Sequence, residues 1–212
     1  MPLLWRRASQ SASTRPDAEK GGAEGQRRGR EVGVLSWISS VFNLCAALKD
    51  LKREGWVRRG VQEPESVADH SYSLALLAML AAAERGLDPL RAAALAVIHD
   101  LAEAVLGDLT PSEKEARPHY EEGERRVIEE VVEKLPEQAG SLLQKLYDEY
   151  ASQSSEEARL VKQLDKLEMA LQAARYEAEK RGKEGLAEEF KRSALNAVTD
   201  STLRGVIDRE ME

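Results

Sequence analysis

The chain has 212 residues, a formal net charge of −7 and a single cysteine. This length suits one domain, and its richness in Ala, Leu, Glu, Lys and Arg with few aromatic residues favours helix over sheet. The acidic balance argues against binding to nucleic-acid polymers, and no apolar run is long enough to span a membrane. Because Cys45 cannot form an internal disulfide, we expect a soluble protein of the cytoplasm, a reducing compartment.

Residues 1–31 differ in composition from the rest of the chain. They contain seven Lys or Arg against four Asp or Glu, many Gly and Ser, and few apolar residues after Trp5. Such a segment cannot bury enough apolar surface to offset its conformational entropy. We therefore expect a disordered basic tail over residues 1–31, or a start codon assigned too early, followed by a folded domain over residues 32–212.

Apolar residues recur at helical spacing along most of the remaining chain, and no stretch alternates like a strand. The fold class is therefore predicted to be all-α, a bundle of amphipathic helices. The helix that ends near Leu106 is apolar on nearly all of its surface, so we expect it to be buried at the centre. The predicted helices span residues 34–54, 66–85, 89–106, 120–135, 137–150, 156–180, 184–197 and 200–211.

The loop between the first two predicted helices carries Trp56, Arg58 and Arg59. The tryptophan could simply pack against the core, and the two arginines could simply be solvated. However, loops often carry function, and an aromatic ring beside guanidinium groups suits a phosphorylated ligand that contains a ring. We expect these three residues to contact a substrate.

Two histidines and two aspartates lie on three predicted helices that have apolar, core-facing stripes. They are His70, the adjacent pair His99–Asp100, and Asp165. Each of them alone has an ordinary explanation as a hydrogen-bonded core residue or a surface charge. Helices of one bundle can nevertheless bring all four side chains together. Two imidazoles and two carboxylates suit a divalent ion such as Mn, Co, Fe, Mg, Ni or Zn.

Three segments of the chain resemble the HD superfamily of metal-dependent phosphohydrolases, and within it the 5′-deoxynucleotidases. They are GWVRRGVQEPESVADHSY from residue 55, LAVIHDLAEAVLGDLTP from residue 95, and YDEYASQSSEEARLVKQLDKLEMALQAARYE from residue 147. The resemblance covers residues 35–195. It implies an HD-domain helical bundle, usually a homodimer, that hydrolyses deoxynucleoside 5′-monophosphates to deoxynucleoside and phosphate.

The resemblance also assigns roles to individual residues. The implied metal ligands are His70, His99, Asp100 and Asp165, with Mn, Co or Mg as the ion. Two carboxylates, Glu103 and Asp108, would act as acid–base groups or would bind a second ion together with the backbone carbonyl of Leu109. A metal-activated water would attack the phosphorus in line. The loop residues would serve the substrate, with Arg58 or Arg59 on the phosphate and Trp56 on the sugar or base.

Two other interpretations stay open at this point. The chain could be another HD phosphohydrolase that acts on a cyclic nucleotide, an alarmone or a nucleoside triphosphate, although a triphosphate would require more basic residues near the metal. It could instead be a non-catalytic helical dimerisation module with a vestigial metal site. That second interpretation predicts a damaged ligand set, whereas all four candidate ligands are present.

Overall fold

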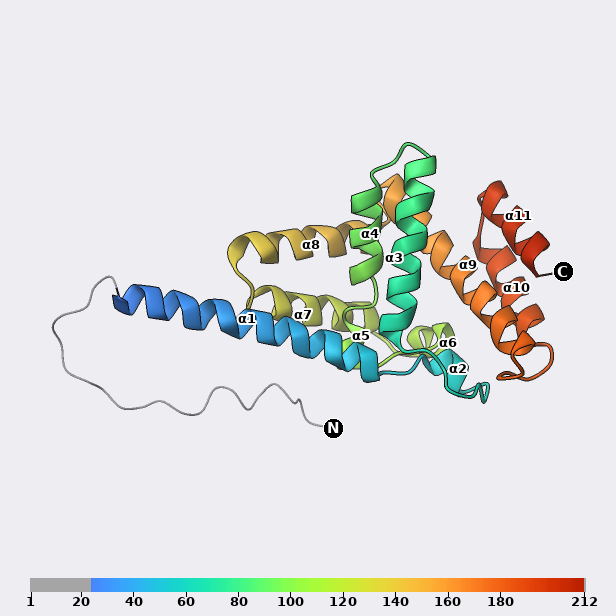
Figure 1. Ribbon diagram of the computed structural model, residues 1–212, viewed down its shortest axis with the longest axis horizontal. Helices are drawn as coiled ribbons and strands as arrows, with labels where there is room; N and C mark the ends of the chain where they lie inside the picture. The colour runs from blue at the N-terminus through green and yellow to red at the C-terminus, as the bar shows by residue number, and fades with distance from the viewer. Residues whose placement is uncertain (1–23, 212) are drawn as a thin grey trace.

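The computed structural model describes residues 24–211, and helices account for most of this range (Figure 1). Over the same range, the only β-type pairing is an isolated antiparallel bridge between Lys52 and Ser66, which confirms the predicted all-α class. The helices are α1 (Glu24–Asp50), α2 (Glu54–Val57), α3 (Val67–Glu84), α4 (Pro89–Ile98), α5 (Glu103–Leu106), α6 (Pro111–Glu115), α7 (Tyr120–Val132), α8 (Glu137–Ser152), α9 (Glu156–Ala178), α10 (Leu186–Ala197) and α11 (Ser201–Glu210).

The first helix begins earlier than the sequence pattern predicts. Helix α1 starts at Glu24 and ends at Asp50, whereas the apolar spacing predicts a helix over residues 34–54. Residues 24–31 of the predicted tail are therefore helical in the structure. Residues 1–23 lie outside the described part of the chain, so the predicted tail stays a prediction there.

The prediction of one continuous helix over residues 89–106 is wrong. Helix α4 ends at Ile98, and turns lead from there to the short helix α5. At this point Nδ1 of His99 donates a hydrogen bond to the carbonyl of Ala96 over 2.7 Å, and the amide of Leu101 donates to the carbonyl of Ile98 over 3.0 Å. These bonds to residues three positions back tighten the chain into a turn and end the helix.

Helix α4 is also less buried than its apolar sequence predicts. Ala92, Leu95 and Ala96 are fully buried against neighbouring helices, but Leu90 and Val97 are 74% and 56% exposed. Helix α4 packs against α3, α8 and α9, which together cover only part of its surface. One apolar face of α4 is therefore left on the outside of the described molecule.

The start of α3 is fixed by hydrogen bonds that the sequence predicts. The side chain of Ser66 accepts from the amide of Asp69 over 3.1 Å, and the carboxylate of Asp69 accepts from the amide of Ser66 over 2.8 Å. This capping box determines where α3 begins, so that His70 follows in its first turn. The amide of Arg53 donates to the carbonyl of Glu65 over 3.1 Å, which holds the chain after α1 beside the start of α3.

No helix within residues 24–211 combines the length and the apolar character needed to cross a membrane.

Candidate metal centre

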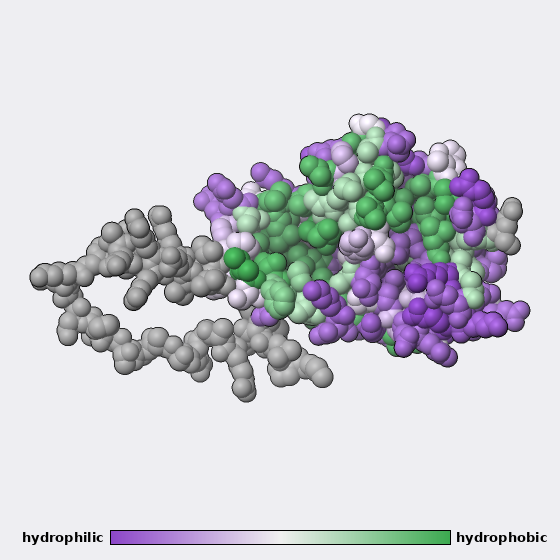
Figure 2. Space-filling model, in the orientation of Figure 1, coloured by the Kyte–Doolittle hydropathy of each residue, from purple (hydrophilic) through white to green (hydrophobic). Residues whose placement is uncertain are grey.

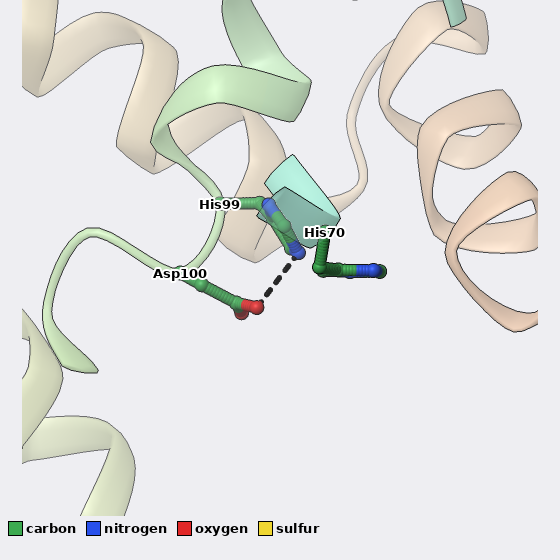
Figure 3. Close-up of side chains that lie close together, drawn as sticks. All are labelled: His70, His99 and Asp100. Carbon is green, nitrogen blue, oxygen red and sulfur yellow. Dashed lines mark ion pairs between the residues drawn. The ribbon is translucent and has the colours of Figure 1, made fainter. Parts of the chain in front are cut away.

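His70, His99 and Asp100 meet inside the bundle, where their ligand atoms all lie within 4.8 Å of one another (Figure 3). His70 comes from α3, and the other two come from the turn that ends α4. Asp165 of α9 completes the group, with its Oδ1 atom 3.2 Å from Nε2 of His70. The fold thus brings together all four residues that the sequence predicts as metal ligands.

The protein determines which nitrogen of each imidazole is free to bind a metal. Nδ1 of His70 lies 2.7 Å from the carboxylate of Glu168, and Nδ1 of His99 lies 2.7 Å from the carbonyl of Ala96. A carboxylate and a carbonyl can only accept hydrogen bonds, so each Nδ1 carries the proton. In the neutral imidazoles, both Nε2 atoms therefore present a lone pair to the centre.

These lone pairs face negatively charged oxygens. Nε2 of His99 lies 2.9 Å from the carboxylate of Asp100, and Nε2 of His70 faces Asp165. Both Nε2 atoms and Oδ1 of Asp165 are buried and have no hydrogen-bond partner. Buried acceptors that face one another are costly unless a proton or a metal cation lies between them. The donor set of two imidazole nitrogens and two carboxylates therefore fits a divalent metal ion.

The pKa of His70 leads to an expectation about metal binding. Burial and the Arg53 guanidinium lower this pKa, but Asp165 and Glu168 outweigh them and raise it to about 10. Below that pH the metal-free protein holds a proton that the ion must displace, so metal affinity should rise by about tenfold per pH unit towards pH 10. Calorimetry in two buffers of different ionisation enthalpy should show about one proton released per ion near pH 8. Binding without proton release would contradict the assignment of His70.

Glu168 is hydrogen-bonded to one of the two candidate ligand histidines. Its side chain is buried on α9, and it accepts the hydrogen bond from Nδ1 of His70. Glu65 lies nearby, with a carboxylate oxygen within 4.8 Å of a ring nitrogen of His70 and of a carboxylate oxygen of Glu168. The side chain of Glu65 also accepts a hydrogen bond from the indole N–H of Trp56 over 2.8 Å. Burial and the charge of Glu168 raise the pKa of Glu65 to about 7.

Arg53 is a residue of this site that sequence reasoning missed. Its guanidinium is buried and lies 3.0 Å from the carboxylate of Asp100. The same nitrogen lies 3.8 Å from Oε2 of Glu103 and 3.6 Å from Oδ1 of Asp108. Burial opposes the charge of Arg53, but the surrounding carboxylates outweigh it and raise its pKa. Arg53 therefore places a fixed positive charge directly beside the predicted metal ligands.

Glu103 and Asp108 both lie at this site, but in different surroundings. Glu103 is 1% exposed, and its Oε2 atom has no hydrogen-bond partner. Burial, followed by the charges of Asp100 and Asp108, raises the pKa of Glu103 to about 9. Asp108 instead accepts a hydrogen bond from the amide of Glu54 over 2.6 Å, which ties it to the start of α2. Leu109 follows Asp108 directly and is half-buried.

Trp56 lies in the core of the protein, 1% exposed. Its ring packs against Tyr176 and Phe190, with centroid distances of 5.3 and 4.4 Å, and its N–H is bonded to Glu65. Packing is the role that these contacts support. The predicted contact of Trp56 with a sugar or base stays a prediction.

Arg58 and Arg59 make ion pairs with carboxylates other than the four candidate ligands. Arg58 lies 2.9 Å from Glu54 and 2.5 Å from Glu113, and its side chain is 52% exposed. Arg59 pairs with Glu189 and donates to the carbonyl of Gly55. Their predicted role on the phosphate stays a prediction, and Arg53 is the arginine that contacts the candidate ligands.

Comparison with known proteins gives consistent results. A model of the HD domain family matches residues 45–203. A mouse protein named 5′-deoxynucleotidase HDDC2 is 40% identical over 149 residues, which cover 70% of this chain and 72% of the mouse protein. The human protein of the same name is 42% identical over 136 residues, which cover 64% of this chain and 66% of that protein. Among solved structures, the PH0347 protein of Pyrococcus horikoshii OT3 matches 82% of this chain and 98% of its own, with 33% identity and a TM-score of 0.67.

Proposed function

The chain belongs to the HD domain family, and we propose that it is a metal-dependent 5′-deoxynucleotidase. A phosphoric monoester hydrolase of this kind hydrolyses deoxynucleoside 5′-monophosphates to deoxynucleoside and inorganic phosphate. The observation that carries the proposal is the set of buried, unpartnered acceptor atoms on His70, His99 and Asp165. This set suits a divalent ion, in a chain whose relatives at 40–42% identity are named 5′-deoxynucleotidase.

The ion would be held by Nε2 of the two histidines and by the carboxylates of Asp100 and Asp165. When bound, a divalent ion lowers the pKa of water and polarises phosphate oxygens. Mixed nitrogen and oxygen ligands accept several ions, and we propose Mn, Co or Mg. A second ion at Glu103, Asp108 and the carbonyl of Leu109 would have to share its carboxylates with Arg53. The position of this guanidinium supports a single ion beside a protein cation.

Arg53 is the residue that we propose to bind the substrate phosphate. Arg presents several N–H donors in a plane, which suits two phosphate oxygens at once. Exchange of Arg53 for Gln should lower kcat/KM on dAMP by about 10- to 100-fold, because a hydrogen bond to a charged group is lost. Arg58→Gln serves as the comparison in the same steady-state assay. A large loss in Arg58→Gln with little change in Arg53→Gln would instead support Arg58 as the phosphate ligand.

Glu103 is the group that we propose as the general acid for the leaving 5′-oxygen. Its raised pKa keeps a proton on the carboxyl group at neutral pH in the metal-free protein, and its Oε2 atom is unpartnered. Asp108 is a weaker candidate, because the amide of Glu54 already engages one of its oxygens. The alternative, that both act as ligands of a second ion, is tested by the number of ions bound.

The direct test of this proposal is phosphate release by the purified protein. It would be assayed with Mn, Co or Mg on dAMP, AMP, cAMP and dATP. Turnover of dAMP above all the others is the expected result. Preference for cAMP or dATP would identify a different HD phosphohydrolase. No turnover of any substrate by metal-loaded protein would favour the non-catalytic dimerisation module.

The exposed apolar side chains support a homodimer as part of the proposal. Such residues lie on α1, α3 and α4, and Figure 2 shows apolar surface gathered over this region. Contiguous apolar surface of this kind commonly marks a protein interface. A Leu80→Glu variant should shift the mass measured by light scattering from dimer to monomer, whereas a wild-type monomer at micromolar concentration would contradict the proposal. The most exposed of these residues are Phe42, Tyr72, Leu80, Leu90 and Val97.

A cytoplasmic location is also proposed. The only cysteine, Cys45, is free and exposed on α1, and such a thiol suits a reducing compartment. Localisation of the tagged full-length chain in its own cells tests this. Residence in an oxidising compartment would contradict it.

A further inference from the structure

Lys114 reaches the buried carboxylate of Glu103 from helix α6. Its Nζ atom lies 3.0 Å from Oε1 of Glu103, and its side chain is 33% exposed. Glu103 is 1% exposed, so this contact joins a lysine at the surface to a group inside the candidate site. Glu103 contacts two cations in the structure, Lys114 on Oε1 and, at a longer distance, Arg53 on Oε2.

The backbone of Lys114 is held by local hydrogen bonds. Both the hydroxyl and the amide of Thr110 donate to the carboxylate of Glu113, over 2.7 and 3.0 Å, and form a capping box. The amide of Lys114 donates to the carbonyl of Thr110 over 3.0 Å. Glu113 also pairs with Arg58, which ties α6 to the chain after α2. These contacts fix the backbone of Lys114, which limits the directions that its side chain can take.

The side chain of Lys114 is also held in place by contacts with neighbouring residues. Its ammonium lies 3.6 Å from the carboxylate of Glu124 on α7 and 5.2 Å from the centre of the Tyr120 ring. A lysine on an exposed helix face with no other role would extend its ammonium group into water. These contacts instead direct the ammonium of Lys114 inward, towards Oε1 of Glu103.

We propose that Lys114 is a positioning residue that determines which oxygen of Glu103 faces the metal centre. An ammonium group only donates hydrogen bonds, and Lys114 donates to Oε1 of Glu103. The other oxygen, Oε2, is left free. Oε2 is the buried, unpartnered oxygen on the side of Arg53. This inference deepens the proposed function and rests on it, because it assigns to Lys114 the alignment of the proposed general acid.

A purely structural role would also be consistent with the contact, because Lys114 supplies a hydrogen bond to a buried carboxyl group. The two roles differ in what they do to kcat. A charge that only stabilises the fold changes the melting temperature and leaves turnover by folded enzyme intact. A positioning residue changes kcat in folded protein, and it acts only while Glu103 is present.

The test compares Lys114→Met, Lys114→Arg and a matched control, Lys183→Met, all as full-length, metal-loaded protein. Lys183 forms an exposed ion pair with Glu189, 4.0 Å apart. Lys114→Met should lower kcat on dAMP by about 10- to 100-fold, the range for residues that orient a functional group, while KM and metal affinity from calorimetry stay within about twofold. Lys114→Arg should recover most of kcat, because a guanidinium can also donate to Oε1. Lys183→Met should match the wild type.

A double-mutant cycle makes the test specific to Glu103. In a Glu103→Gln background, Lys114→Met should cause no further loss of kcat, because Lys114 acts only through Glu103. Full additivity would overturn the proposal. Wild-type kcat in Lys114→Met with only a lower melting temperature would also overturn it, as would a parallel loss of metal affinity. If Lys114→Met does not fold, Lys114→Arg decides, because a folded, inactive Lys114→Arg protein contradicts the proposal. If the wild-type protein does not hydrolyse dAMP, the proposed function itself is wrong. The outcomes that compare the Lys114 variants with an active wild type test the role of Lys114 alone.

Discussion

Exchange of His99 for alanine is expected to remove the metal ion and with it the hydrolysis of dAMP. The loss of metal affinity should exceed about 100-fold, the upper end of the range for residues that merely support a ligand. The reason is that Nε2 of His99 is buried, is held in one tautomer by the carbonyl of Ala96, and lies next to the carboxylate of Asp100. Calorimetry with Mn measures the first effect and phosphate release the second.

The chain offers a matched control for this experiment. His119 is the one histidine outside the site; its side chain is 74% exposed and lies 3.1 Å from Glu122. His119→Ala should bind metal and turn over dAMP like the wild type. Circular dichroism should show both variants to be helical. Full turnover in a folded His99→Ala protein would mean that this histidine is not a metal ligand.

Exchange of Glu103 for glutamine is expected to lower kcat by about 10²- to 10⁴-fold, the usual contribution of a general acid. Glutamine is of similar size but cannot transfer a proton, so KM and metal affinity should change little. The control is Glu188→Gln, which alters an exposed ion pair with Arg192. If the variant loses metal at the same time, Glu103 serves as a ligand, as the alternative of a second ion requires.

The pH profile provides a separate check on Glu103. Burial and the neighbouring Asp100 and Asp108 raise its pKa above the usual value of a carboxyl group, so the acid form predominates at neutral pH. Turnover that depends on this acid should fall as the pH rises and the carboxyl group loses its proton. The fall on the alkaline side should disappear in Glu103→Gln. A profile of the same shape in both proteins would show that another group limits the rate.

The helical class and the four candidate ligands could be predicted from the sequence, because both depend on local pattern. Capping residues and apolar spacing identify most helices, including the start of α3 at Ser66 that positions His70. His99, Asp100 and Asp165 stand out because polar groups in apolar helical stretches require partners. That the four meet at one place follows from the packing of α3, α4 and α9, which the pattern does not determine.

The break after Ile98 could not be predicted in this way. The run from Leu95 to Leu106 is apolar with helical spacing, and its sequence contains no proline or glycine before Gly107. What ends the helix is a hydrogen bond from the His99 side chain to the carbonyl of Ala96, together with the contacts of Asp100. Periodicity does not detect a side chain that competes for a backbone carbonyl.

Two cations of the site, Arg53 and Lys114, were missed for a related reason. Lysine and arginine are abundant in this chain, and a charged residue is usually solvated. Arg53 falls at the end of the predicted first helix, where a basic residue is ordinary. Only the pairing of Lys52 with Ser66 and the bond from the Arg53 amide to Glu65 bring it beside Asp100. Trp56 lies in the core, which is one of the two positions that its sequence context allowed, and its predicted contact with the substrate stays a prediction.

The four candidate ligands come from α3, from the turn after α4 and from α9, so an ion among them would cross-link segments from residue 70 to residue 165. An ion that binds only the folded chain adds to its free energy of unfolding, by about 2.7 kcal/mol at a hundred times its dissociation constant. Removal of the ion by a chelator would therefore lower the free energy of unfolding of the whole bundle. The midpoint temperature of unfolding would therefore report how much of the centre is occupied.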